Sequence, residues 1–201
     1  MQPYEIVAGP FTLWLAPVAT AFPLIDAAPA GAWTKVGTGG DRNYSEDGVT
    51  VAHSQTIEVA RPVGATGPVK AWRTEEDLMV RLTLWDITLE QYRAALNGVA
   101  VTTTAAAEGA AGFKEIGLSQ GQEVTTYALL VRGRSAYGDA YAAQYEVPIC
   151  FQQGNPEVAF VKGVPAGLEL EFRALEDGGA ATAAERFGRL VQQHAAPLPE
   201  A

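Results

Sequence analysis

The sequence predicts a mostly-β fold with one well-defined helix, and three observations predict it. Apolar and polar residues alternate with a period of two in five separate segments. Gly occurs 21 times and Pro 12 times without a regular spacing, as expected for a chain with many turns. Hydrophobic residues make up 48% of the 201 residues, which is enough to form a core without disulfides or metals. We therefore expect one domain over residues 1–201, with no internal repeat.

The alternating segments are the expected strands, each with one buried and one wetter face. In chain order they cover residues 11–16, 49–59, 78–84, 143–152 and 168–173. A further segment, residues 124–132, is apolar almost throughout, which suits a strand that is covered on both sides.

Two segments carry helix signals. Thr88 with Gln91 three residues later forms a capping-box pattern, and Gly98 is a natural stop, so the sequence predicts a helix from Thr88 to Asn97. Thr182 with Glu185 repeats the pattern and predicts a C-terminal helix that ends before Pro197. Gly188 interrupts this second helix, which makes it the weaker of the two.

Three segments are loops by composition: residues 37–48, 60–70 and 105–112. Loops of this length in a compact domain usually have a function. Residues from about 178 to 201 form a C-terminal extension that contains the second expected helix.

Charge and composition exclude several classes of protein. The net charge is −9, which argues against binding nucleic acid by neutralising phosphates. A single cysteine, Cys150, rules out an intrachain disulfide, and two histidines make a zinc site of His and Cys improbable. The uncharged stretch 6–25 contains Pro10 and Pro17, which disfavour a membrane helix. We expect no signal peptide, no membrane association and synthesis in a cytoplasm.

No arrangement of residues supports catalysis, so we expect a protein that is not an enzyme and needs no cofactor or metal. The sequence lacks a phosphate-binding loop and a Gly-x-Ser-x-Gly elbow. Glu75, Glu76 and Asp77 could suggest paired carboxylates, but consecutive residues of a strand point to opposite faces. We interpret them as a charged strand start, and Cys150 and His53 as packed side chains.

One part of the chain resembles a known family. Residues 53–98 read HSQTIEVARPVGATGPVKAWRTEEDL and then MVRLTLWDITLEQYRAALNG. Four features follow one another in this segment: a polar strand, a hairpin from Arg-Pro to Val-Lys, an acidic strand start, and a helix that ends in Leu-Asn-Gly. In this order they resemble the major tail protein, or tail tube protein, of long-tailed non-contractile bacteriophages.

The resemblance implies a β-sandwich or half-barrel with a flanking helix, a fold shared with the inner tubes of contractile tails and type VI secretion. It implies that six copies form a ring and that rings stack into a hollow tube through which the genome leaves the virion. The implied partners are further copies, the tape measure protein, and the tail tip and terminator proteins. Double-stranded DNA would pass through the tube without being held.

Two sets of residues are candidates for these roles. A strand face of small polar side chains would suit a smooth bore, although it would equally suit an outward solvent face. The candidates for the bore are Thr50, Ser54, Thr56, Glu58, Arg81, Thr83, Gln144 and Glu146. Arg81 is expected to be ion-paired. The candidates for ring stacking, in two long loops, are Asp41, Arg42, Tyr44, Arg61, Pro62, Gly67, Pro68 and Lys70.

Two other functions stay open at this stage. A tail-terminator or neck protein of the same virion would form single rings instead of tubes. A carbohydrate-binding β-sandwich would carry rows of exposed aromatic residues beside polar loops, and the sequence shows no convincing row of this kind.

Overall fold

The computed structural model describes residues 2–198 and is mostly β. One antiparallel sheet has eight strands, and a second sheet is a two-stranded hairpin. The described residues contain one short α-helix and three 3₁₀ helices. In chain order the elements are η1 (Pro3–Glu5), β1 (Thr12–Pro17), β2 (Thr34–Lys35), η2 (Gly40–Asn43), β3 (Tyr44–Ala60), β4 (Lys70–Leu84), α1 (Leu89–Ala95), β5 (Val101–Thr104), β6 (Phe113–Ile116), β7 (Thr126–Ser135), β8 (Gly138–Gln152), β9 (Leu168–Ala174), η3 (Ala183–Glu185) and β10 (Arg189–Gln192).

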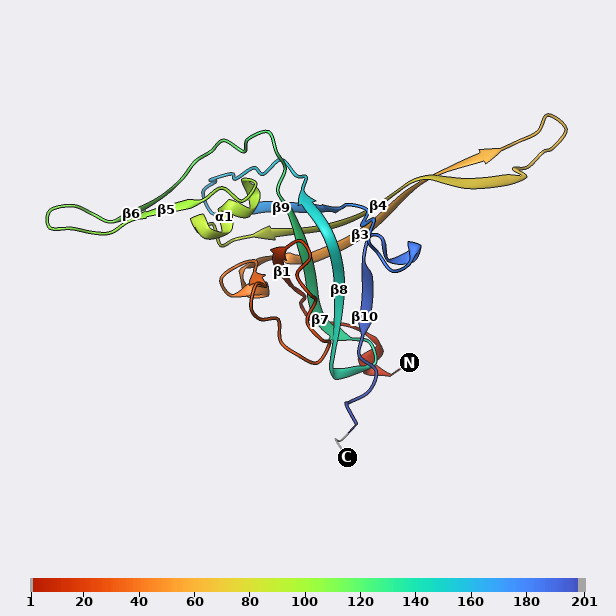
Figure 1. Cartoon of the computed structure of the whole chain (residues 1–201), viewed down its shortest axis with the longest axis horizontal. Coiled ribbons are helices and arrows are strands. Elements are labelled where there is room, and N and C mark those ends of the chain that lie inside the picture. The colour runs from red at the N-terminus through yellow and green to blue at the C-terminus, as the bar shows by residue number, and fades with distance from the viewer. Residues whose placement is uncertain (1, 199–201) are drawn as a thin grey trace.

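The large sheet bends into two layers at β8. Its strand order is β2-β1-β7-β8-β9-β4-β3, with β10 as an additional partner of β8. One edge of β8 pairs with β10 over residues 143–146 and with β9 over Cys150–Gln152. Figure 1 shows β7 and β8 running across the direction of β9, β4 and β3. The end strands β2 and β3 do not pair with each other, so the sheet is not a closed barrel.

The core lies between the two layers, where their apolar faces meet. Each layer contributes side chains that are almost completely buried, as the alternation in the sequence predicts. From β1, β7 and β8 they are Leu13, Leu129, Val131 and Val147, and from β4 and β9 they are Leu78, Val80, Leu82, Leu84, Leu168, Leu170 and Phe172. The predicted strand faces are therefore confirmed for β1, β4 and β9. In β8 the prediction is wrong, because Gln144, Glu146 and Cys150 of the expected wetter face are buried.

Strand β7 is covered on both sides, as its continuous apolar run predicts. Leu130 faces away from the main core and packs in a second cluster with Trp33. The segment 18–33 covers this face, and the Trp33 Nε1–H donates to the carbonyl of Ala21 at 3.0 Å. The Gln144 side chain donates to the carbonyl of Pro23 at 2.9 Å. The first bond closes this long irregular segment on itself, and the second holds it against the sheet.

The first expected helix is confirmed as α1, and its stop is as predicted. Asn97 and Gly98 both have positive φ, at 58° and 75°, which ends the helix. The cap differs from the prediction, because Thr88 makes no side-chain cap bond. The Gln91 side chain instead accepts a hydrogen bond from the Gly37 N–H at 2.8 Å and so ties α1 to another part of the chain.

The second expected helix is wrong. The segment forms only the short η3, and residues 189–192 form β10, antiparallel to β8. Gly188 lies between them with φ at 117°, a conformation that a helix does not contain. Residues 199–201 of the expected extension lie outside the described residues.

The expected loop over residues 37–48 is also corrected, because it is folded. It contains η2 and the start of β3, and the Tyr44 side chain is only 5% exposed. Asp41 accepts a hydrogen bond from the Thr12 hydroxyl at 2.9 Å, whereas Arg42 is exposed. Tyr44 therefore cannot contact a neighbouring ring as a loop residue would.

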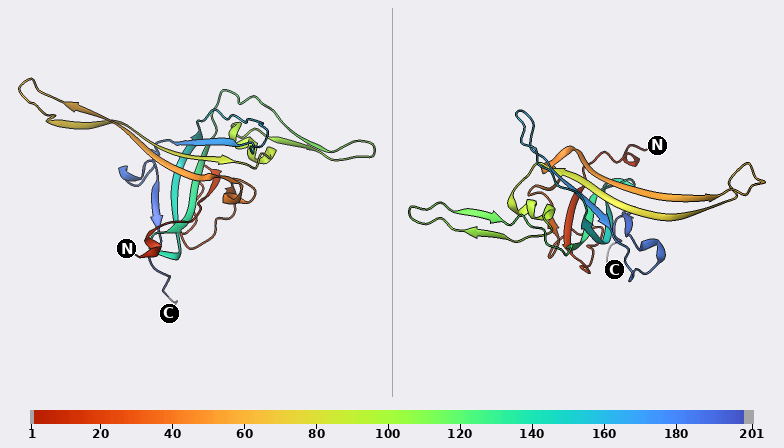
Figure 2. Two further views of the ribbon diagram at one scale, coloured as in Figure 1. Left: turned by 180° about the vertical axis from the view of Figure 1, so that it is seen from behind. Right: turned by 90° about the horizontal axis from the view of Figure 1, so that it is seen from above.

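Two hairpins project from the body on opposite sides (Figures 1 and 2). One is the outer part of β3 and β4 with the connecting loop, residues 53–76, here called the arm. The other is β5–β6, whose tip is the predicted loop 105–112. Residues 53–59 and 69–76 of the arm are all exposed. Within residues 2–198, no helix has the length and apolar character to cross a membrane.

Candidate assembly surfaces

Six of the eight candidates for the bore lie on one face of the β3–β4 ribbon. The strand register puts Thr50 opposite Arg81, and Ser54 opposite Asp77. Thr56 lies opposite Glu75 and its hydroxyl donates to that carboxylate at 3.1 Å. We call this surface the acidic face. With the matching residues of β9 it comprises Thr50, Ser54, Thr56, Glu58, Glu75, Asp77, Arg81, Thr83, Glu169, Glu171 and Arg173.

The arginines of the acidic face are neutralised within the chain. Arg81 Nη2 lies 2.9 Å from Glu171 Oε1, which confirms the predicted ion pair. Arg173 Nε donates to Asp77 Oδ1 at 2.8 Å. Five carboxylates face two guanidinium groups, so the surface keeps an excess of negative charge. Such a surface repels phosphates at distances below the Debye length of about 8 to 10 Å.

Gln144 and Glu146 do not belong to this face, so these two candidates are wrong. They are 1% and 3% exposed, on a face of β8 that the segment 18–33 covers, and β10 pairs along the edge of β8 beside them. Glu146 Oε2 accepts a hydrogen bond from Arg189 Nε of β10 at 2.6 Å. The ion pair raises the pKa of Arg189 above its ordinary value through this hydrogen bond and the adjacent charge. Sequence alternation alone could not reveal that the segment 18–33 covers this polar face or that β10 pairs at its edge.

The end of the arm, residues 57–72, carries apolar side chains in contact with water. We call it the arm tip. Ile57, Val59, Val69 and Trp72 are 50%, 42%, 63% and 45% exposed, and Val63 is fully exposed. The stacking candidates of the second loop lie in the same segment, with every one of Arg61, Pro62, Pro68 and Lys70 exposed and Gly67 partly so. The sequence analysis found the loop but missed the apolar character of the strands that lead to it.

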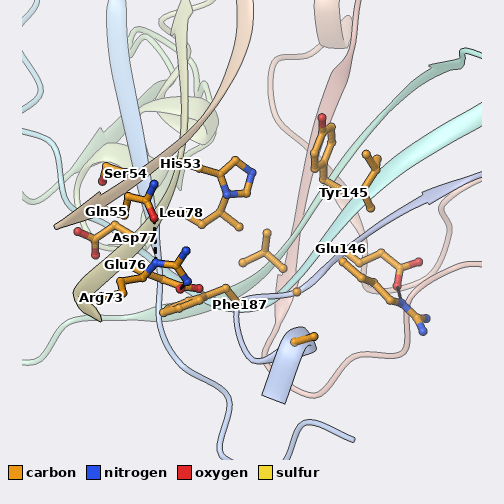
Figure 3. A pocket seen from close by; sticks show the side chains of 15 residues that line it. His53, Ser54, Gln55, Arg73, Glu76, Asp77, Leu78, Tyr145, Glu146 and Phe187 are labelled. Atoms are coloured by element: carbon orange, nitrogen blue, oxygen red, sulfur yellow. Dashed lines mark hydrogen bonds and ion pairs between the residues drawn. The ribbon is translucent and has the colours of Figure 1, made fainter. Parts of the chain in front are cut away.

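A cleft of about 460 Å³ lies beneath the base of the arm (Figure 3). Its wall on one side comes from the arm and on the other from Tyr145 and Glu146 of β8, with Phe187 below. Arg73 Nη1 lies 2.9 Å from Glu76 Oε2, and Arg73 Nε donates to Gln55 Oε1 at 2.9 Å. His53 is exposed at this cleft, so its interpretation as a packed histidine is wrong.

A second cleft, of about 520 Å³, lies between α1 and the strands β1, β2 and β7. We call it the α1 cleft. Its lining includes mostly small or apolar residues, among them Leu15, Ala16, Pro17, Val36, Ala94 and Tyr127. In Figure 1, α1 and β2 lie on the side of the body opposite the arm.

The β5–β6 hairpin is anchored to α1 through Asn97. The Asn97 amide donates to the carbonyls of Gln120 at 2.7 Å and Glu123 at 2.6 Å. Its side-chain oxygen accepts from the Thr125 N–H at 2.6 Å. Glu90 of α1 forms an ion pair with Lys114 of β6. These bonds fix the direction in which the hairpin leaves the body.

The residues considered for chemistry are not gathered into a site. Cys150 is buried, and burial raises the pKa of its thiol far above the usual range, which leaves little thiolate. Within residues 2–198, no group of three or more His, Cys, Asp or Glu is placed to hold a metal ion.

Comparison with known proteins does not assign a family. No protein-family model matches the chain, and no curated protein is detectably similar to it. The acidic face, the arm and the α1 cleft are therefore the features from which a function is inferred.

Proposed function

We propose that this chain is a tail tube protein whose rings stack into the hollow tube of a long, non-contractile phage tail. The observation that carries the proposal is the arm. Strands β3 and β4, of 17 and 15 residues, leave the body as a two-stranded ribbon. A two-stranded ribbon alone is marginally stable in water. A neighbouring copy that packs on the arm would supply the contacts that a single copy lacks.

Unpaired strand edges support assembly from identical copies. Strand β3 is the last strand of its sheet, so one edge of it has no partner strand in the described residues. Strand β4 pairs with β9 only from Met79 to Leu84, which leaves its edge open along the arm. Long open edges promote pairing with another chain, and closing a ring removes them. The number of six copies comes from the family resemblance.

The acidic face supports a role in conducting DNA. In the proposed ring it would line the bore, where short polar side chains and an excess of carboxylates face the phosphates. Because both of its arginines are held by Glu171 and Asp77, neither is available to grip a phosphate. The proposed partners are further copies, the tape measure protein, the tail tip and terminator proteins, and DNA in transit. The proposed location is the virion tail.

Electron microscopy of the purified chain tests the proposal. At high concentration, alone or with its virion partners, we expect negatively stained tubes with a central hole. Sedimentation velocity should show large assemblies that grow with concentration. A chain that stays monomeric under all these conditions would overturn the proposal. Single rings that never stack would identify a terminator or neck protein instead, and a glycan-binding monomer would indicate a carbohydrate-binding module.

A variant with a shortened arm makes the test sharper. Gly64 and Gly67 have nothing within 4 Å, so the arm loop touches no other part of the chain there. Replacing Arg61–Pro68 with Asn-Gly, a favoured two-residue hairpin turn, should leave the fold intact. We expect this shortened variant to unfold at the wild-type temperature but to form no tubes. Tubes of normal length would refute the role of the arm in stacking.

A further inference from the structure

We infer that β10 is a latch for the segment 18–33, so that the two segments open together. We call the segment 18–33 the strap, because it lies across the outer face of β7 and β8. The two are linked by a relay of three side chains, Arg189 of β10 with Glu146 and Gln144 of β8. The inference concerns a single copy of the chain and goes beyond the proposed function, so neither depends on the other.

The relay begins at Arg189 and ends at Pro23 of the strap. Arg189 Nε donates to Glu146 Oε2 at 2.6 Å (Figure 3). The other oxygen of this carboxylate, Oε1, accepts from Gln144 Nε2 at 2.5 Å, and the same nitrogen donates to the carbonyl of Pro23 at 2.9 Å. Among the described residues, no hydrogen bond joins the strap directly to residues 177–193. The hydrogen-bonded connection between the two segments therefore runs through β8.

The centre of the relay is buried, so water does not satisfy its members. The side chain of Glu146 is 4% exposed, and Arg189 forms its ion pair. A buried carboxylate that loses its cation is strongly destabilised until water reaches it. Gln144 Oε1 has no hydrogen-bond partner among residues 2–198, so the two oxygens that face its nitrogen orient this amide. When Glu146 turns toward water, one of these oxygens is lost, and the bond from Gln144 to Pro23 weakens.

The start of β10 separates two cavities, and both are lined by Glu146. One is the cleft of about 460 Å³ beneath the arm, and the other has about 270 Å³ and is lined by Phe22 of the strap. Gly188 and Arg189 line both cavities and so form part of the wall between them. Lifting β10 would join the two spaces and admit water to Glu146 and to the underside of the strap.

Strand β10 is the part that opens first. None of its four residues is buried, and β8 is its one partner strand among residues 2–198. Segments with few buried contacts open at the lowest free energy. The strap is held more firmly, because the Arg132 guanidinium donates to the carbonyls of Ile25 and Ala27. Trp33 of the strap is also buried in the second apolar cluster. Strand β10 is therefore the latch, and the strap is the segment that it holds.

Hydrogen–deuterium exchange followed by mass spectrometry tests the latch. Arg189→Met removes the cation and leaves the carboxylate buried, so peptides of the strap should exchange more than about ten-fold faster than in the wild type. Arg186→Met is the matched control, because Arg186 pairs with Glu176 in an exposed ion pair. It should leave exchange in the strap unchanged, and unchanged exchange in α1 should show that both variants are folded. Equal exchange of the strap in the two variants would overturn the inference.

A double variant separates the relay from a general effect of losing β10. Glu146→Gln combined with Arg189→Met leaves no charge on the relay, so the strap should recover most of its protection although β10 lacks its ion pair. If the strap exchanges as fast in the double variant as in Arg189→Met, the relay does not carry the coupling and the inference fails.

Coupling between two segments is reciprocal, so the strap should also act on β10. Trp33→Leu loosens the strap over β1 and β7, which β8 separates from β10. Peptides that contain Arg189–Gln192 should then exchange faster than in the wild type. Trp85→Leu, at a tryptophan that is 45% exposed, is the control and should leave β10 unchanged. An unchanged β10 in Trp33→Leu would refute the latch, whether or not the chain forms tubes.

Discussion

The phenol of Tyr44 donates a hydrogen bond to the carbonyl of Val36 at 2.8 Å. The same oxygen accepts from the N–H of Leu13 at 3.1 Å. Because Tyr44 begins β3 and Leu13 lies in β1, this side chain connects the two ends of a sheet whose end strands do not pair. One buried hydroxyl therefore bridges the opening that keeps the sheet from being a barrel.

Tyr44→Phe should lower the free energy of unfolding by about 1–3 kcal/mol, because it leaves a buried N–H and a buried carbonyl without a partner. Urea denaturation followed by circular dichroism measures the change. Tyr137→Phe, at an exposed position, is the matched control and should change stability little. Equal stabilities for the two variants would contradict the bridging role.

Tyr44 should also make the fold sensitive to alkali. Burial raises the pKa of the Tyr44 phenol above its ordinary value, because the phenolate would lose its hydration. A group with a raised pKa contributes its stability below the unfolded pKa of about 10 and loses it as the pH rises further. The wild type should therefore lose stability above about pH 10 more steeply than Tyr44→Phe. Burial also raises the pKa of Tyr127, so this residue accounts for part of the loss of stability with pH that remains in Tyr44→Phe. Parallel pH profiles would contradict the prediction.

Gly188→Ala should detach β10. Gly188 has φ at 117°, and an added Cβ would lie 2.0 Å from the carbonyl oxygen of Glu146. The backbone must shift, which removes Arg189 from the buried Glu146 carboxylate. We expect a loss of more than about 1 kcal/mol in urea denaturation. Gly178→Ala, where nothing lies within 4 Å, is the control. A variant as stable as this control would show that β10 contributes little.

Reversing charge on the acidic face should make assembled tubes retain DNA. Glu58→Lys with Glu75→Lys exchanges two carboxylates for cations on this face. In a gel-shift experiment, we expect salt-sensitive retention of double-stranded DNA by the variant tubes and none by the wild type. Glu46→Lys with Asp47→Lys makes the same change in charge at exposed positions near the start of β3. Equal retention by both pairs would place the acidic face outside the bore.

The strands that build the core, and α1, could be predicted because local patterns decide them. Apolar and polar residues alternate along β1, β4 and β9, so only one face of each strand can point to the core and bury leucines such as Leu82 and Leu170. The stop of α1 follows from Asn97 and Gly98, whose left-handed backbone needs no distant partner.

The rest depends on contacts between distant segments, which a local pattern does not contain. Leu190 and Val191 fit a helix face as well as a strand, and only the free edge of β8 decides for the strand. The burial of Gln144 likewise depends on the distant segment 18–33, and Glu146 is paired with Arg189 of β10. The length of the arm also exceeded the prediction, because the chain continues as β4 back to Lys70 despite a register shift near Thr56.

Strand β8 has partners along both edges, with β7 on one and β10 and β9 on the other. Amide hydrogens in its centre, around Val147, should exchange with deuterated solvent only when the whole domain opens. Those of the arm, which lacks a third strand, should exchange fast until assembly protects them. Mass spectrometry of exchanging peptides would then show slow exchange in β8 and fast exchange in the arm. A drop in the exchange rate of the arm peptides alone would mark the moment at which a copy joins the growing polymer.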